Sequence, residues 1–474
     1  MIYTILISYI AITFWGSLFG SKLKDATPES YFLANRDLGT LSLFFTILAT
    51  NFSAFYFLGF AGEGYKIGYA HYIIMGIGTA LAGLSFLIIG TKTWKLGKKF
   101  GYITPSELIF GQTRNRILSS LFSVVMIVFT LPYLSLQIIG GGYILENLTN
   151  GDLSYNLSIC LLTVVTIIYV VIGGMQSVAK TDLKQGLIVI LFMTLAVILI
   201  GNSLGGITTA NIIALEIKPD LFAIQGIADH YTAKKWFSFI VFWFFCVPMF
   251  PQLFMRFYIA RDISHLKKSA VLYAFIPIII SILPVMIGVW GHISFPGLDS
   301  KAADQILPMM LMRHTSEWFA AIVMTGAIAA FMSTLDSQLL ALSTMVTRDL
   351  YVPFFNKNLD FKKEVLTGRV LVALFAIIGL LIAFNPFDTI FDMGKMAFSG
   401  LAILFPVALA ATRFKIVKPI FPIIGIFISL GLLFGFYYKL IPIRLAFGFE
   451  YFMVLIFVSF VFTFFGVGKG KGEF

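Results

Sequence analysis

The chain has 474 residues, of which 59% are hydrophobic and only 12% are charged. A soluble chain of this length would divide into two or three domains, whose surfaces need far more charged residues than this. The composition therefore excludes an ordinary soluble protein and predicts an all-α polytopic membrane protein embedded in a lipid bilayer.

Apolar runs long enough to cross a hydrocarbon core of ~30 Å recur along the whole chain. We expect about 13 transmembrane helices, in chain order 2–20, 39–62, 71–91, 116–146, 154–174, 183–203, 236–257, 269–293, 317–347, 367–384, 389–412, 417–437 and 448–468. The first span is predicted to be a retained anchor and not a cleavable signal peptide, because basic residues follow it and none precedes it.

The basic residues predict the orientation of the chain. With the N-terminus outside, the cytoplasmic gaps and adjoining span ends carry 25 Lys and Arg and the external ones 8, while Lys395 lies inside a span. This asymmetry obeys the positive-inside rule and predicts a multi-pass plasma-membrane protein with a cytoplasmic C-terminus. The net charge of +11 thus reflects the orientation of the chain in the membrane. Because the basic residues form no contiguous face, we expect no nucleic-acid partner.

Catalytic signatures are missing from the sequence. No HExxH or GxSxG motif is present, and the five histidines and two cysteines are scattered over span ends, loops and spans. The sequence therefore predicts neither an enzyme nor a resident metal centre.

One apolar span, 317–347, carries an unusual concentration of oxygen atoms in the stretch AAFMSTLDSQLLALS (329–343). Helical spacing places these residues on one face: Ala330, Ser333, Thr334 and Ser337. Asp336 lies beside that face, and a carboxylate at membrane depth costs about 2.5–3.5 kcal/mol on insertion scales. Isolated hydroxyls usually bond back to their own helix or join helices, but together with a carboxylate they favour a site for a hard cation.

Asp182 closes the segment GGMQSVAKTD (173–182), where a predicted cytoplasmic gap meets the next span. It is either an interfacial acid paired with Lys180 or Lys184, or a second acid that approaches the hydroxyl face. In the second case the two carboxylates would make that face a cation site.

Two spans are disrupted in mid-membrane. ILATNFSAFYFLGFAG (47–62) contains Asn, Ser and small residues, and FWFFCVPMFPQLFMRF (242–257) contains two prolines. Broken helices persist in lipid only where the freed backbone lines a cavity or binds something. Each disrupted span opens a set of five, and an odd number gives the two sets opposite orientations, as in transporters built from inverted repeats. The predicted organisation is an N-terminal helix and loop, 1–38, repeats at 39–203 and 236–413, and extra C-terminal helices, 414–474.

Four segments together resemble signature segments of the solute:sodium symporter family: YFLANRDLG (31–39), GGMQSVAKTDLKQG (173–186), PQLFMRFYIARD (251–262) and AAFMSTLDSQLLALSTMVTRDLY (329–351). The resemblance covers nearly the whole chain, in the same order and spacing. It implies a LeuT-type fold with five plus five core helices and Na+ as the coupling ion.

The resemblance also implies roles for individual residues. The sodium-binding positions would be Ala49, Phe52, Ala330, Ser333 and Thr334. A second cation or release site would use Asp182, Ser337 and Asp336, and the substrate site would use Asn51, Ser53, Tyr56, Gln137, Trp243 and Pro251. Lys395 either meets a substrate carboxylate or pairs with Asp392 three residues earlier, and we favour the pair.

We therefore expect a monomeric, sodium-coupled secondary active symporter that imports a small organic solute by alternating access. The solute would be of the monocarboxylate or amino acid type. The alternatives are a proton-coupled transporter of the same fold or one for another solute, such as pantothenate or a sugar. An ion channel is disfavoured because two broken helices occupy matching places.

Overall fold

The computed structural model describes residues 2–6, 8, 33–356 and 360–468. Within helices it leaves undescribed the side chains of 34, 172–186, 188–189 and 361. The first predicted span, 2–20, thus lies mostly outside the described residues.

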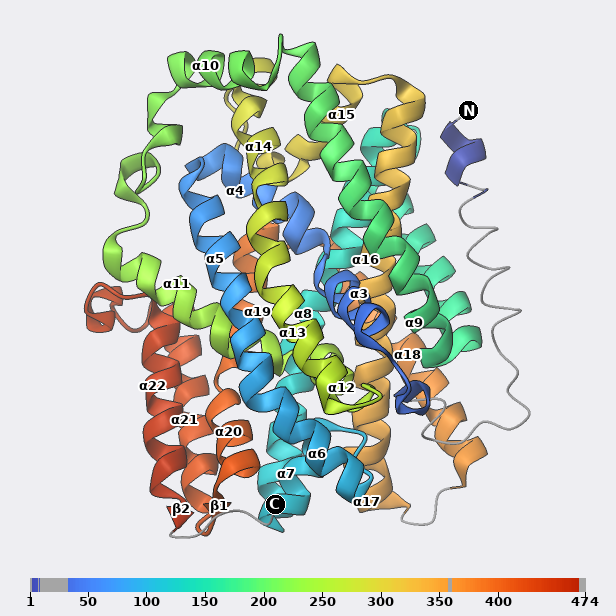
Figure 1. The fold of residues 1–474 in the computed structure, drawn as a ribbon, viewed down its shortest axis with the longest axis vertical. Coiled ribbons are helices and arrows are strands. Elements are labelled where there is room, and N and C mark those ends of the chain that lie inside the picture. The colour runs from blue at the N-terminus through green and yellow to red at the C-terminus, as the bar shows by residue number, and fades with distance from the viewer. Residues whose placement is uncertain (1, 7, 9–32, 357–359, 469–474) are drawn as a thin grey trace.

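Helices dominate the described part of the chain (Figure 1). The first half comprises η2 (Ala34–Arg36), α3 (Thr40–Asn51), η3 (Phe55–Gly59), α4 (Phe60–Ile67), α5 (Ala70–Ser85), η4 (Phe86–Gly90), α6 (Thr91–Phe100), α7 (Pro105–Thr113), α8 (Arg116–Leu148), α9 (Tyr155–Ser203), α10 (Ile207–Ile217), η5 (Pro219–Phe222) and η6 (Ile227–Asp229). The π-helical turns η3 and η4 continue directly into α4 and α6, so two of the predicted spans run further than expected, to Ile67 and Phe100.

The second half begins with the other disrupted span. It comprises α11 (Ala233–Cys246), η7 (Val247–Met249), α12 (Pro251–Tyr258), α13 (Ile263–Ile280), α14 (Ile282–Ser294), η8 (Ala302–Gln305), α15 (Ile306–His314), α16 (Glu317–Met345), η9 (Val346–Tyr351), α17 (Val352–Phe355), α18 (Phe361–Phe384), α19 (Ile390–Ala402), α20 (Phe405–Arg413), α21 (Ile420–Tyr437), η10 (Ile443–Ala446) and α22 (Tyr451–Phe465). Two short antiparallel strands, β1 (Lys415–Ile416) and β2 (Val467–Gly468), tie the ends of α20 and α22 together.

The helix α9 covers two of the predicted spans without a non-helical gap between them. A straight helix of its 49 residues would extend roughly 74 Å, more than twice the hydrocarbon core. Yet both of its ends meet the η8–α15 segment. Asn147, beside the start of α9, donates to Gln305 over 2.8 Å, and Ser203 at the other end lies 2.8 Å from His314. The two ends of α9 therefore lie at the same end of the bundle, and α9 is not one straight helix.

The predicted count of 13 spans is not confirmed. Within the described residues, seven helices are long and apolar enough to cross a membrane, or ten if each of three bent pairs is one span. The apolar helices Tyr155–Val171 and Tyr451–Phe465 are shorter than that criterion. The short helices α10 and α15 were not expected, since both lie in gaps that were predicted as loops.

Figure 1 shows the bundle with α10 and α15 at one end and α6, α7, α17 and the strands at the other. We call these the α10 end and the α7 end. The central helix is α16, which packs against α3, α8, α9, α12 and α18 and has 89% of its most apolar window buried. By contrast, only 28% of the most apolar window of α18 is buried, so α18 lies at the outside of the bundle. The oxygen-rich stretch of α16 thus lies in the protein core and not against lipid.

Candidate functional site

The first broken helix leaves the helical path directly after Asn51. Phe52 has φ −79° and ψ 90°, and the next helical residues belong to η3. The backbone N–H of Ala54 inside the break donates to Oε1 of Gln137 over 2.9 Å, and Nε2 of Gln137 donates to the carbonyl of Tyr133. A buried N–H without a partner would be costly, so Gln137 of α8 stabilises the break.

The second broken helix owes its shape to proline. After α11 the chain forms the turn η7, which contains Pro248, then takes an extended residue, Phe250 (φ −64°, ψ 122°), and restarts at Pro251 as the first residue of α12. Proline has no N–H to continue the ladder but suits a first helical position. The two broken helices bend by the same angle, 61°, as expected for the same position in two inverted repeats.

The hydroxyl face of α16 meets the first break. Thr334 Oγ1 lies 3.4 Å from the carbonyl oxygen of Ala49, 3.2 Å from that of Thr50 and 3.3 Å from that of Ala330. These residues and the neighbouring Ser333 are at most 1% exposed. Carbonyl and hydroxyl oxygens from two helices thus converge on one buried point, and such oxygens are the ligands of hard cations.

Phe52, the fifth predicted sodium-binding residue, is the first residue beyond α3 and is buried within the same break. Its ring packs 4.5 Å from that of Tyr56, measured between centroids. The structure therefore brings the predicted sodium positions of α3 and α16 to the same place, although they are 285 residues apart at Ala49 and Thr334.

The residues of the predicted second cation site lie one turn further along α16. Asp336 is fully buried, and neither of its carboxylate oxygens has a hydrogen-bond partner among the described residues. Ser337 Oγ accepts a hydrogen bond from Arg256 Nη2 over 2.8 Å, and the same nitrogen lies 3.3 Å from Thr50 Oγ1. The side chains of Asp182, Lys180 and Lys184 are outside the described residues, so their part in this site stays a prediction.

A small cavity lies between the two breaks, with a volume of about 10 Å³, which is room for about one water molecule. Its lining consists of Asn51, Phe55, Tyr56, Phe60, Thr79, Tyr133, Trp243, Val247, Phe250 and Phe398. Three predicted substrate residues are therefore in place: Asn51, Tyr56 and Trp243. Ser53, Gln137 and Pro251 do not line the cavity. Gln137 and Pro251 shape the breaks instead, and Ser53 is buried inside the first one.

We call this space between the two breaks the central cavity. Most of its polar side chains form hydrogen bonds with residues of other helices. Asn51 Nδ2 donates to the hydroxyl of Tyr273, and the hydroxyl of Tyr56 lies 2.9 Å from Ser281 Oγ. The indole N–H of Trp243 is the exception, since it is buried without an acceptor among the described residues. It offers a donor to a bound solute.

A larger pocket of about 680 Å³ lies at the α10 end. Phe391 lines this pocket and Phe55 lines the central cavity, and their rings stack with centroids 5.4 Å apart. This aromatic pair thus lies between the two spaces. Lys395 also lines the pocket and forms an ion pair of 2.7 Å with Asp392, which confirms the pairing we favoured.

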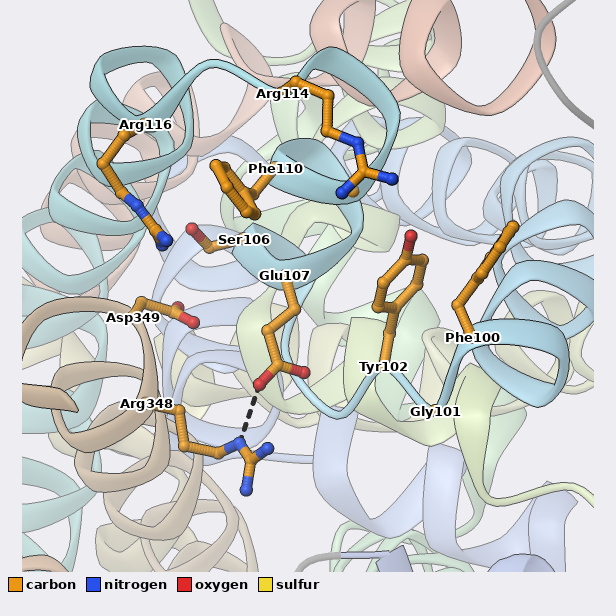
Figure 2. Close-up of a pocket in the computed structure, with 11 residues that line it drawn as sticks. Phe100, Gly101, Tyr102, Ser106, Glu107, Phe110, Arg114, Arg116, Arg348 and Asp349 are labelled. Atoms are coloured by element: carbon orange, nitrogen blue, oxygen red, sulfur yellow. Dashed lines mark hydrogen bonds and ion pairs between the residues drawn. The ribbon is translucent and has the colours of Figure 1, made fainter. Parts of the chain in front are cut away.

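The α7 end is closed by polar contacts (Figure 2). Arg348 of η9 pairs with Glu107 of α7 over 2.8 Å and with Glu364 of α18 over 2.9 Å. The buried carboxylate of Asp349 accepts hydrogen bonds from Thr104 over 2.6 Å and Ser123 over 2.9 Å. These bonds join α7, α8, η9 and α18 beside a surface pocket of about 420 Å³. This cluster was not predicted from the sequence, because its members are far apart in the chain.

Comparison with known proteins agrees with this architecture. The model of the sodium:solute symporter family matches residues 31–415. The chain is 28% identical over 407 residues to the sodium/pantothenate symporter of Haemophilus influenzae, covering 84% of this chain and 82% of that protein. It is 26% identical over 390 residues to the osmoregulated proline transporter OpuE of Bacillus subtilis, covering 81% and 77%.

Solved structures agree on the fold. A Na+-coupled sialic acid symporter in a substrate-bound outward-open state matches with a TM-score of 0.82 at 16% identity, covering 100% of this chain and 98% of that chain. MhsT in complex with L-phenylalanine matches with a TM-score of 0.58 at 11% identity, covering 90% and 98%. The LeuT-type fold implied by the sequence resemblance is thereby confirmed. With its two matched helix breaks and a family match over most of its length, the chain belongs to the sodium:solute symporter family, which consists of membrane transporters and not enzymes.

Proposed function

We propose that the protein is a sodium-coupled secondary active symporter that imports a small, carboxylate-bearing organic solute by alternating access and acts as a monomer. The observation that carries this proposal is the meeting of Thr334 Oγ1 with the carbonyl oxygens of Ala49 and Thr50. A sodium ion held there by Ala49, Phe52, Ala330, Ser333 and Thr334 would connect the central helix to the first break. Sodium binding would thus be coupled to the geometry of the central cavity.

The direction of transport follows from the orientation of the chain. The bias of Lys and Arg toward the α7 end supports a cytoplasmic position for that end and an external position for the α10 end. Inward movement of one sodium ion is then driven by its gradient and by the membrane potential, which contributes about 2.3 kcal/mol per charge per 100 mV.

The solute would occupy an enlarged form of the central cavity. Asn51, Tyr56 and Trp243 supply polar groups within an otherwise aromatic lining, the usual composition of a small-molecule site. The relatives are named for pantothenate and proline, and the fold neighbour for sialic acid, and all three solutes carry a carboxylate. The indole N–H of Trp243, which has no acceptor among the described residues, suits such an oxygen-rich solute.

Alternating access would use the two closures already described. Parting Phe55 from Phe391 would connect the central cavity to the pocket at the α10 end. Releasing Arg348 from Glu107 and Glu364 would open the α7 end. A cycle that opens one closure at a time carries the solute and sodium across together.

Uptake into proteoliposomes tests the proposal. Radiolabelled proline, pantothenate and lactate are offered under an inward sodium gradient, a proton gradient without sodium, or neither. Saturable uptake of at least one solute that requires sodium supports the symporter. Uptake driven by protons alone would favour the proton-coupled alternative, and non-saturable flux a channel.

Ser333→Ala should raise the sodium concentration required for half-maximal uptake. The matched control is Ser343→Ala, because Ser343 lies on the same helix and its hydroxyl donates only to its own helix, to Leu340 over 3.0 Å. Equal sodium dependence of the two variants would contradict the assigned site.

A further inference from the structure

Two arginines of the surface pocket at the α7 end have no acidic partner among the described residues. Arg114 directly follows α7 and Arg116 is the first residue of α8, and both are exposed. Both line the pocket of about 420 Å³. In the view of Figure 2, their guanidinium groups lie on one side of Glu107 and Arg348 lies on the other. The pocket thus presents two positive charges that the polar contacts of the α7 end do not use.

The two acids that line the same pocket are bound to other groups. Oε1 of Glu107 accepts a hydrogen bond from Arg348 over 2.8 Å, and its Oε2 accepts one from the backbone N–H of Ile103 over 2.7 Å. Both carboxylate oxygens of Asp349 accept hydrogen bonds from hydroxyl groups. The two exposed arginines are therefore open to an anion from outside the chain.

Arg116 is held in an orientation that suits a phosphate group. Its guanidinium carbon lies 3.9 Å from the centre of the Phe110 ring, which also lines the pocket. A guanidinium that stacks on a ring by its face keeps the N–H donors along its edge, and these match two oxygens of one phosphate group. The aromatic contact thus prepares Arg116 to bind phosphate through two hydrogen bonds.

A stripe of apolar side chains begins directly after Arg116. Its members are spaced by four, three and four residues and therefore share one face of α8: Ile117, Leu121, Val124 and Val128. Three of them are exposed, Ile117 to 68%, Val124 to 41% and Val128 to 49%. Since α8 is long and apolar enough to cross a membrane, this face contacts acyl chains there, and Arg116 lies where the span begins, at the depth of the lipid head groups.

We propose that this pocket binds the phosphate group of an anionic phospholipid whose acyl chains lie along the apolar stripe of α8. A soluble phosphate compound could bind the arginines, but it would leave the adjoining stripe without a partner of its own. Basic pockets between membrane helices are typical sites for anionic head groups. The inference goes beyond the proposed function, since neither sodium nor the solute takes part in it.

Native mass spectrometry of the purified full chain tests the inference. Phosphatidylglycerol and phosphatidylcholine with identical acyl chains are titrated in separate series. We expect the wild type to bind a first phosphatidylglycerol more tightly than a first phosphatidylcholine. The double variant Arg114→Gln, Arg116→Gln should weaken phosphatidylglycerol binding about 25-fold, because each arginine beside an anionic lipid changes the affinity about fivefold. Binding of phosphatidylcholine should change much less.

The charge-matched control is the double variant Lys95→Gln, Lys98→Gln. These lysines of α6 are exposed at the same end of the bundle, but they do not line the pocket (Figure 1). The control removes the same total charge and should keep the wild-type preference for phosphatidylglycerol. It therefore separates the pocket from the general attraction between a basic surface and an anionic lipid.

Two further measurements identify the source of the phosphate. Phosphatidylglycerol with a photoreactive diazirine in its acyl chain should label α8 between Ile117 and Val128 in the wild type, and should label it less in the double arginine variant. Inorganic phosphate and glycerol 3-phosphate should not displace the lipid at millimolar concentrations, because neither compound can contact the apolar stripe.

Equal weakening of lipid binding in the arginine and lysine double variants would overturn the inference. A wild type without preference for phosphatidylglycerol, or acyl-chain labelling confined to other helices, would also overturn it. Displacement of the lipid by glycerol 3-phosphate would show a site for soluble phosphate compounds instead. If the double arginine variant does not fold, the two single variants and the labelling of the wild type decide the question.

Discussion

Asp304 offers a sharp test of how the α10 end is held together. It lies in η8 and is 2% exposed, and its Oδ2 accepts a hydrogen bond from the backbone N–H of Ile390, the first residue of α19, over 2.8 Å. Its Oδ1 has no partner among the described residues and faces Gly62 of α4, where an added Cβ would lie 2.7 Å away. One carboxyl group thus bonds a connecting segment to α19 and packs against α4.

Burial raises the pKa of Asp304 from 3.8 to about 7, although the bond from Ile390 and the charge of Lys66 lower the pKa in part. The folded protein therefore prefers the protonated carboxyl group. Its contribution to stability is complete below about pH 4, declines as the pH rises, and is lost above about pH 7. At ~1.4 kcal/mol per pH unit, this shift of about three units corresponds to ~4 kcal/mol.

Asp304→Asn should remove this pH dependence, because the amide oxygen can still accept from Ile390 but the group cannot ionise. Thermal unfolding of the purified protein between pH 5 and pH 9 measures the effect. The variant should be the more stable protein above pH 7, by roughly 4 °C if unfolding entropy is ~2.1 cal/mol/K per residue, and the difference should shrink toward pH 5. The control Asp299→Asn removes an exposed carboxylate from the same segment and should keep the wild-type pH dependence. A difference between wild type and Asp304→Asn that stays constant from pH 5 to pH 9 would refute the reasoning.

Three further changes test other parts of the site. Thr334→Val keeps the shape of the side chain but removes the hydroxyl. A hydrogen bond or ligand to a charged group contributes ~1.5–3 kcal/mol, so the sodium concentration that protects against thermal unfolding should rise about 10- to 100-fold. Phe391→Ala removes the ring stacked on Phe55 and should raise the KM for the solute while sodium dependence stays unchanged. Glu107→Gln keeps an acceptor for the capping box but loses the charge paired with Arg348, so amide hydrogen exchange should become faster in α7 and η9.

The sequence predicted those features that depend on local chemistry. Proline at 248 and 251 favours a helix break because proline has no N–H to continue the hydrogen-bond ladder, and hydroxyls at helical spacing share a face in any fold. The pairing of that face with Ala49 was predicted through family resemblance, because nothing in the intervening chain specifies which helix packs on which.

Features that depend on distant contacts were not predicted. The chain contains 51 phenylalanines, and no local pattern distinguishes Phe55 and Phe398 at the cavity from the many that face lipid or the core. Gln137 was assigned to the solute because it matches a substrate-site position in the family resemblance. The structure shows a different role for this residue. The backbone N–H groups of a broken helix require hydrogen-bond acceptors, and the side-chain oxygen of Gln137 accepts from the N–H of Ala54.

The two closures of the central cavity differ in chemistry, and this difference bears on the order of events. Parting Phe55 from Phe391 separates a stacked aromatic pair, worth ~0.5–1.5 kcal/mol beyond the buried area. Opening the α7 end separates Arg348 from two carboxylates and Asp349 from two hydroxyls, all of which must then be hydrated. In the proposed cycle, breaking these polar contacts at the α7 end should therefore cost more than parting the aromatic pair. The hydrogen bonds of Arg256 to Thr50 and Ser337 also join α12 to α3 and α16, one turn of α16 beyond Thr334, so in the proposed cycle they add to the contacts that opening this side would break.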